Sequence, residues 1–175
     1  MLGRAMGTGL LAGLAGVAAM TAAEKVEQRF TGRPDSQVPG MVLARMRGRT
    51  PATGPGLQRR MWVNHVGMGT GVGVVRGLMA FAGLRGPWAS AMFTVVRLTA
   101  DQIVENWTGA GAPPWTWPRD ELVIDLAGKA VYAFAAGVVA DRIAAAAPDS
   151  APGLQHARAA GGHRVHDVGP VAPAR

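Results

Sequence analysis

The sequence of 175 residues contains no cysteine, which excludes disulfide bonds and thiolate metal ligands. Lysine is almost absent too: Lys25 and Lys129 are the only two, so nearly all basic charge comes from arginine. Aromatic residues make up only 6% of the chain, and they do not alternate with arginines as in a nucleic-acid-binding module. The net charge of +7 therefore favours an anionic membrane surface over nucleic acid as the partner.

Charge is also scarce within four apolar stretches, residues 2–23, 62–84, 87–103 and 122–143. Each is close to the roughly 20 residues that a helix needs to cross the hydrocarbon core of a bilayer. The stretches predict an all-α fold, a bundle of four transmembrane helices. The last three contain charges such as Arg76 and Asp125, which are costly inside a membrane. A soluble helical bundle is therefore the competing interpretation.

Two pairs of segments repeat along the chain. Residues 23–32 read AEKVEQRFTG and residues 100–109 read ADQIVENWTG, with alanine, threonine and glycine identical at three positions. Residues 64–77 likewise align with residues 128–141 and share Gly-Val-Val. The first two apolar stretches thus recur as the last two. This predicts two tandem helical hairpins, residues 1–84 and 85–145, related by an axis along the membrane normal.

The two ends of the chain have their own interpretations. Residues 2–23 also fit a signal peptide, with Arg4 before an apolar run and small residues after it. A segment that has a repeat partner later in the chain is not expected to be cleaved, so we assign residues 1–145 to the membrane domain. Residues 146–175 are rich in alanine, proline and glycine, which predicts a disordered tail.

The segment NHVGMGTGVGVVRG, residues 64–77, has closely spaced glycines like those of a nucleotide-binding loop. Such a loop needs a strand before it and a helix opening after it, whereas these glycines lie inside an apolar stretch. At helical spacing they share one face, and small residues at every fourth position let membrane helices approach closely. The same faces are compatible with a homodimer. The residues predicted to pack helices together are Gly9, Gly13, Gly69, Gly73, Gly77, Ala133 and Gly137.

Ionisable residues in and beside the stretches correspond between the repeats. Glu24 aligns with Asp101, and His65 aligns with Lys129, so all four are predicted at similar depth near the connections between helices. Ionisable groups at membrane depth usually face the interior and pair with one another. The candidate polar cluster comprises Glu24, His65, Arg97, Asp101, Asp125, Lys129 and Tyr132.

This cluster has two interpretations. In the first, Arg97 with Asp101 and Asp125 with Lys129 are neutralising pairs, four residues apart, that allow polar helices to insert. In the second, the cluster is a pocket whose protonation responds to pH, with His65 as the switch.

Basic residues predict the orientation. They are more numerous in the two connections that follow the first and third stretches than on the opposite side. The positive-inside rule then places these connections in the cytoplasm and both termini outside.

The order of the motifs TGRP, NHVGMGTGVGVVRG and PPWTWPRDELVIDLAGKAVYAFAAGVV resembles the YagU-like inner-membrane proteins of bacteria, over roughly residues 5–143. The resemblance implies a His-x-x-Tyr-Gly-like pattern in the second and fourth helices. His65 and Gly69 match it, with Met68 in place of tyrosine, whereas Lys129 replaces the second histidine and Tyr132 is retained. That replacement speaks against a two-histidine mechanism. A link to acid tolerance is all that the resemblance implies about function.

Together these features predict a small, multi-pass protein of the bacterial cytoplasmic membrane, whose partner is the lipid bilayer and which is pH-responsive or linked to acid stress. No Ser/His/Asp order, paired-carboxylate site or metal-spaced histidine set is visible, so we expect no enzymatic activity, cofactor or metal. A membrane scaffold without ion chemistry is the alternative function.

Overall fold

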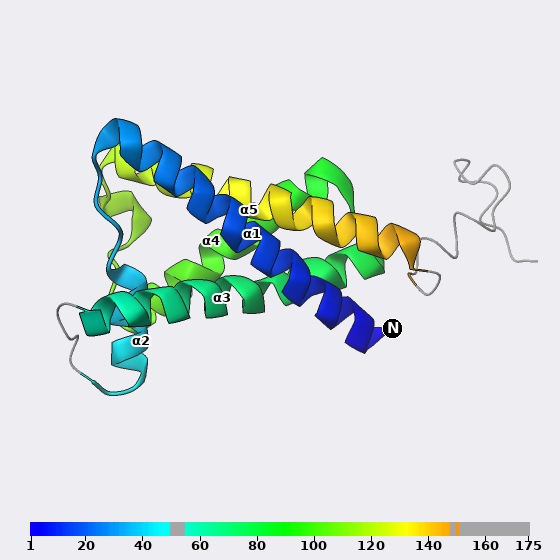
Figure 1. Ribbon diagram of the computed structural model, residues 1–175, viewed down its shortest axis with the longest axis horizontal. Coiled ribbons are helices and arrows are strands. Elements are labelled where there is room, and N and C mark those ends of the chain that lie inside the picture. Colours follow the sequence, from blue (N-terminus) through cyan, green and yellow to red (C-terminus); the bar gives the residue numbers. More distant parts are fainter. Residues whose placement is uncertain (50–54, 148–149, 151–175) are drawn as a thin grey trace, which may run out of the picture.

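The computed structural model describes residues 1–49, 55–147 and 150, and within these ranges the protein is all-helical, without strands (Figure 1). The predicted α-helical class is therefore confirmed for the described part of the chain. Most of the predicted tail, residues 148–149 and 151–175, lies outside the described residues. The helices are α1 (Leu2–Thr31), α2 (Val38–Met46), α3 (Pro55–Ala82), α4 (Gly86–Trp107) and α5 (Arg119–Ala146), with a 3-10 turn, η1 (Pro114–Thr116), before α5.

The long helices α1, α3, α4 and α5 alternate in direction. In Figure 1, α1 and α4 end, and α3 and α5 begin, at the end of the molecule where α2 and η1 also lie. We call this the connection end; it includes segments 32–37 and 108–118. The N-terminus and the end of α5 lie at the opposite end. Helix α1 packs along both α3 and α5, while α2 packs against α3 and α4 packs mainly against α5.

The repeated Thr-Gly dipeptide ends α1 and α4 in the same manner. Gly32 and Gly109 both adopt the left-handed conformation, with φ of 69° and 67°, which glycine reaches without steric cost. The packing of the two hairpins differs, however. Helix α1 lies along α5, whereas its repeat counterpart α4 only touches α3. The structure thus repeats local features without establishing the predicted two-fold relation.

Helices α1 and α3 cross with their backbones in contact at glycines. A Cβ atom added to Gly9 would lie 2.5 Å from the Cα of Val74, and one added to Gly13 would lie 2.7 Å from the carbonyl oxygen of Thr70. A Cβ on Gly73 would in turn meet the backbone of Gly9 and Gly13. Without glycine at these positions the two helices could not approach so closely.

The other predicted packing residues also lie at helix contacts. Gly69 faces Val17, and Gly77 faces the backbone of α1. In α5, Ala133 is fully buried, and Gly137 faces Ser90 of α4. In contrast, Cβ atoms at the neighbouring glycines 67 and 71 would have nothing within 4 Å. Only the alternate glycines of the segment 64–77 therefore serve the contact with α1.

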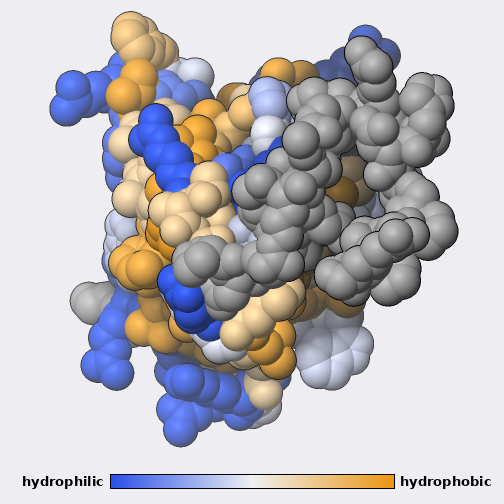
Figure 2. All heavy atoms as spheres, turned by 90° about the vertical axis from the view of Figure 1, so that its right-hand side faces the viewer, coloured by the Kyte–Doolittle hydropathy of each residue, from blue (hydrophilic) through white to orange (hydrophobic). Residues whose placement is uncertain are grey.

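Three charged side chains are buried in the described part of the chain, while large apolar side chains are exposed on its surface. Arg76 is fully buried, and Arg97 and Lys129 are each only 5% exposed. Large apolar side chains point outward from all four long helices, for example Val95, which is 63% exposed. Such side chains (orange) reach the outer surface in Figure 2, next to charged ones (blue). The outward apolar side chains include Leu10, Leu11 and Leu14 of α1, Val75 and Leu78 of α3, Met92, Val95 and Val96 of α4, and Phe134 and Val138 of α5.

By length and composition, α1 and α5 are apolar enough to cross a membrane. Within the described residues, α3 and α4 do not pass the same test of length and hydropathy. Both contain a buried arginine, Arg76 in α3 and Arg97 in α4, which lowers their mean hydropathy. By length and composition alone, therefore, only two of the four predicted transmembrane helices, α1 and α5, qualify within the described residues.

A buried ion pair joins the helices at the end opposite the connection end. The guanidinium of Arg76 donates to Asp141 Oδ1 at 2.7 Å, and the backbone N–H of Gly86 donates to Asp141 Oδ2 at 2.8 Å. Arg76 also donates to the carbonyl of Leu84 at 3.3 Å. These bonds connect α3, α5 and the turn between α3 and α4. The sequence analysis did not pair Arg76 with Asp141, because the repeat alignment sets Arg76 opposite Ala140.

The glycine crossing predicts unequal effects of two matched substitutions in α3. Gly73→Ala should lower the free energy of unfolding by about 1–3 kcal/mol, since the added methyl group meets the backbone of α1. Gly71→Ala should be neutral or stabilise by up to about 1 kcal/mol, because its site is open and alanine favours helix. Thermal unfolding of the detergent-solubilised protein, followed by circular dichroism, measures both. Equal shifts for the two variants would contradict the crossing.

Candidate functional site

A partly open cavity of about 900 Å³ lies at the connection end, lined by residues of all five α-helices and of the segments that join them. Helices α1 and α3 cross at their glycines and diverge toward this end, as Figure 1 shows. The space between the diverging ends is the cavity. Much of its wall is apolar, with Met20, Trp62, Val104 and Ile124 among the lining residues.

Most of the predicted polar cluster lines this cavity. Tyr132 is not part of the lining: it is fully buried and donates a hydrogen bond to the carbonyl of Gly69 at 2.5 Å. Its ring lies against Arg97, whose guanidinium carbon is 5.2 Å from the ring centroid. The predicted residues that line the cavity are Glu24, His65, Arg97, Asp101, Asp125 and Lys129.

Four of these residues form a continuous ion-pair network between α4 and α5. Arg97 pairs with Asp101 within α4, and Lys129 pairs with Asp125 within α5. The ammonium group of Lys129 also lies 3.5 Å from Asp101 Oδ2, which links the two helices. Two cations and two carboxylates cancel, and Arg97, Asp101 and Lys129 are largely buried. The arrangement matches the neutralising pairs of the first interpretation and adds a bond between helices.

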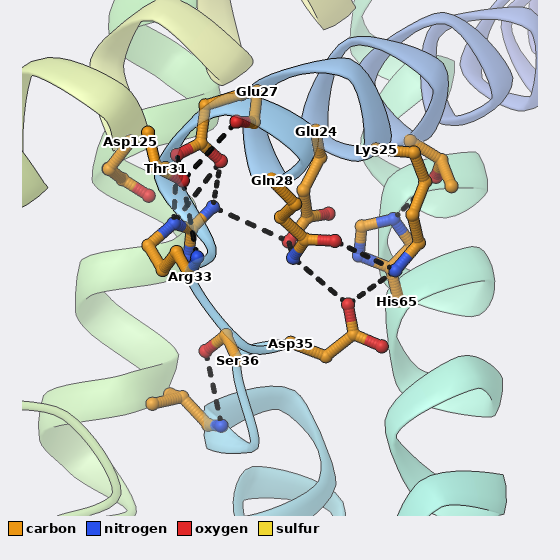
Figure 3. Close-up of polar contacts among 12 residues, drawn as sticks. Glu24, Lys25, Glu27, Gln28, Thr31, Arg33, Asp35, Ser36, His65 and Asp125 are labelled. Atoms are coloured by element: carbon orange, nitrogen blue, oxygen red, sulfur yellow. Dashed lines mark hydrogen bonds and ion pairs between the residues drawn. The ribbon is translucent and has the colours of Figure 1, made fainter.

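Glu24 pairs with Arg33, in the segment that follows α1, and not with this network. In Figure 3 it lies with the segment that follows α1, where Arg33 turns back toward α1. The guanidinium of Arg33 is 3.7 Å from Glu24 and 3.0 Å from Glu27, and the amide of Gln28 donates to Glu24 at 3.4 Å. The hydrogen bond to Glu27 raises the pKa of Arg33, which remains charged. Glu24 thus belongs to a separate polar group at the end of α1, formed with Glu27, Gln28 and Arg33, which we call the rim of the cavity.

Asp35 completes the rim. Lys25 donates to Asp35 Oδ1 at 2.5 Å and Gln28 donates to the same oxygen at 3.0 Å (Figure 3). These bonds, that from Lys25 first, hold the pKa of Asp35 below its usual value. The sequence analysis missed Arg33 and Asp35, because only the folding back of the segment TGRPDS brings them against α1.

His65 bridges α1 and α3 at the cavity wall. Its Nε2 atom lies 3.1 Å from the hydroxyl of Thr21 in α1, and its ring meets the edge of Trp62 at 5.9 Å between centroids. Arg97 and Asp101 of α4 are the charged groups whose fields reach it. His65 therefore lines the same cavity as the ion-pair network, and within the described residues its side-chain hydrogen bond goes to Thr21 of α1.

The lining carries an excess of negative charge. Seven carboxylates and four Lys or Arg side chains line the cavity, an excess of three carboxylates when His65 is neutral. Each of the four cations pairs with at least one carboxylate. The carboxylates are those of Glu24, Glu27, Asp35, Asp101, Glu105, Glu121 and Asp125, and the cations are Lys25, Arg33, Arg97 and Lys129.

Glu105 and Asp125 are partly buried carboxylates with unused acceptor oxygens. Among the described residues, no side chain or backbone group hydrogen-bonds to the Glu105 carboxylate, which is half-buried. Asp125 Oδ2 is buried and accepts no hydrogen bond there either. The described residues contain no group of three His, Asp or Glu side chains suited to a metal ion.

Comparison with models of protein families, with curated proteins and with solved structures found no match. The resemblance to YagU-like proteins remains an expectation from short motifs.

The ion-pair network predicts a ranking of two substitutions. Asp101→Asn removes the carboxylate that contacts both Arg97 and Lys129, and should lower the free energy of unfolding by about 3–5 kcal/mol, as for a broken buried pair. Asp125→Asn should cost less, because Lys129 keeps Asp101 as a partner and Asp125 is more exposed. Unfolding by a denaturing detergent in mixed micelles measures both. The reverse ranking would contradict the network.

Proposed function

We propose that the protein is a multi-pass integral protein of the bacterial cytoplasmic membrane, a four-helix bundle without enzymatic activity. The observation that carries this proposal is the exposure of large apolar side chains on all four long helices, together with the burial of Arg76, Arg97 and Lys129. In water such a surface would favour aggregation, whereas lipid requires it. A soluble bundle, the competing interpretation, would bury the apolar faces.

The same observation supports α3 and α4 as membrane spans. Their charged residues lower their mean hydropathy, but Arg76 and Arg97 are buried and paired within the protein. The surface that these helices would present to lipid is apolar, as at Leu78 of α3 and Val95 of α4. Mean hydropathy counts a buried arginine as if it faced lipid, and so underestimates such helices.

Tryptophans support the position of the helices in the bilayer. Trp107 and Trp115 are exposed at the connection end, and Trp88 is exposed near the opposite end. Tryptophan prefers the headgroup level on both sides of a membrane. Arg45 and Arg47 also lie at the connection end, at the end of α2. We therefore assign the connection end to the cytoplasm and both termini to the outside.

We further propose that the cavity is responsive to pH, consistent with the acid-tolerance link of the resemblance. The supporting observation is the contact between His65 and Thr21, which joins α1 to α3 where they diverge. Protonation of His65 would place a new positive charge in a partly apolar cavity, where Asp101 would attract it and Arg97 would repel it. The connection end is where such a charge would shift the two helices.

Membrane insertion has a direct test. The protein should stay in the membrane pellet after an alkaline carbonate wash, and reporters fused to either terminus should be active only outside the cytoplasm. A reporter inserted in the α4–α5 connection should show the opposite location. Release by carbonate, or a monodisperse protein in buffer without detergent, would overturn the proposal.

The pH response can be followed by a distance reporter between the end of α1 and the start of α3. We expect a transition between about pH 5 and 8, the range in which histidine titrates, that is absent in His65→Ala. His163→Ala, which removes a histidine from the C-terminal segment, should keep the transition. An unchanged midpoint in His65→Ala would refute the role of His65.

A further inference from the structure

We propose that the cavity at the connection end binds an amphiphilic molecule with a primary ammonium group, whose charge lies against Glu105 and whose apolar body lies along the cavity wall. This goes beyond membrane location, because the cavity and its charges belong to the fold wherever the helices reside.

The charge of the cavity is the first step. The whole chain has a net charge of +7, yet the cavity lining has an excess of three carboxylates. The negative lining is thus a local arrangement and does not follow from composition. Every lining cation is already paired with a carboxylate of the protein. The excess carboxylates of the lining would therefore be neutralised by a cationic ligand that enters the cavity.

Glu105 is the residue best placed to receive that cation. Its carboxylate lines the cavity, half-buried, and has no hydrogen bond or ion pair within the described residues. A Cβ at Gly111 would lie 2.9 Å from Glu105 Oε2, so glycine at position 111 leaves room for the carboxylate. The charges nearest in effect to Glu105 are those of Asp101 and Asp125, and they are opposed by those of Lys129 and Arg97, which are already paired within the protein.

The free acceptor oxygens favour an ammonium group with N–H donors. Asp125 Oδ2 is buried and accepts no hydrogen bond in the described part of the chain. Buried acceptors without a donor are costly, and a primary ammonium group brings three donors. The apolar lining, including Trp62 and Ile124, is suited to the hydrocarbon part of the same molecule. Such a molecule is either a free amphiphilic amine or a lipid with an ethanolamine headgroup.

A matched pair of probes tests the sign of the charge. The full-length protein in a nonionic detergent at pH 8 is titrated with 4-phenylbutylamine, and separately with 4-phenylbutyrate, which has the same phenylalkyl body and a negative charge. Calorimetry and the fluorescence of Trp62 and Trp117, which line the cavity, report binding. We expect saturable binding of the amine only. Equal binding of both probes, or no binding of the amine, would overturn the proposal.

A set of variants tests the assigned carboxylate. Glu105→Gln should weaken amine binding by about tenfold or more, the loss typical of a charge-assisted hydrogen bond. Glu105→Asp should restore most of it. Asp120→Asn, an equal change of charge in the first turn of α5 and outside the cavity lining, should bind as the wild type does. Circular dichroism verifies that each variant is folded. Amine binding by folded Glu105→Gln that equals that of Asp120→Asn would refute the assignment.

Nanodiscs distinguish the two sources of the ammonium group. Amine binding is measured in discs of phosphatidylglycerol alone and in discs that also contain phosphatidylethanolamine, with protein-free discs as blanks. Competition by phosphatidylethanolamine, lost in Glu105→Gln, would identify a lipid headgroup as the occupant. Equal binding in both disc types would identify a free amphiphilic amine.

Discussion

The contact between the backbones of α1 and α3 is the constraint on which the rest of the structure depends. Because Gly9 and Gly13 meet Gly73 without intervening side chains, the helices touch near one end and diverge toward the other. The divergence creates the cavity, and the residues that line it are those beyond the crossing point. Bulkier residues at the crossing would separate the helices along their whole length and remove the difference between the two ends.

The same geometry accounts for the surroundings of two polar groups: the Arg76–Asp141 pair and the ion-pair network between α4 and α5. Where the helices are close, Arg76 is fully buried and bonds to Asp141 and to the carbonyl of Leu84. Where they diverge, the ion pairs of Arg97 and Lys129 border an open cavity. A buried charge is tolerated only when its partner is in place, so the Arg76–Asp141 pair has a single arrangement. The network that borders the cavity has space beside it for further groups.

The long helices, the packing glycines and the pairs Arg97–Asp101 and Asp125–Lys129 could be predicted from the sequence because each depends on spacing along a single helix. Gly69 and Gly73 share a face by helical geometry, and so do Arg97 and Asp101. Sequence reasoning could not pair Arg76 with Asp141, 65 residues away, since that bond depends on the relative register of α3 and α5. Nor could it place Arg33 and Asp35, whose contacts require the segment after α1 to fold back. The predicted two-fold relation rested on local similarity, which does not determine how α4 packs against α3.

The proposed membrane location would strengthen the electrostatic field of the carboxylates that line the cavity. In a water-filled cleft on a soluble protein, three excess carboxylates would be neutralised by mobile counterions at little cost. Within the headgroup region, beside apolar walls, screening is weaker and the field of each carboxylate reaches further. Glu105 would then attract whichever amphiphilic cation the bilayer concentrates at its surface, and Arg45 and Arg47 outside the cavity would hold the same end against anionic lipid. In the proposed orientation, the basic residues outside the cavity would face lipid phosphates, and the carboxylates inside it would face ammonium groups.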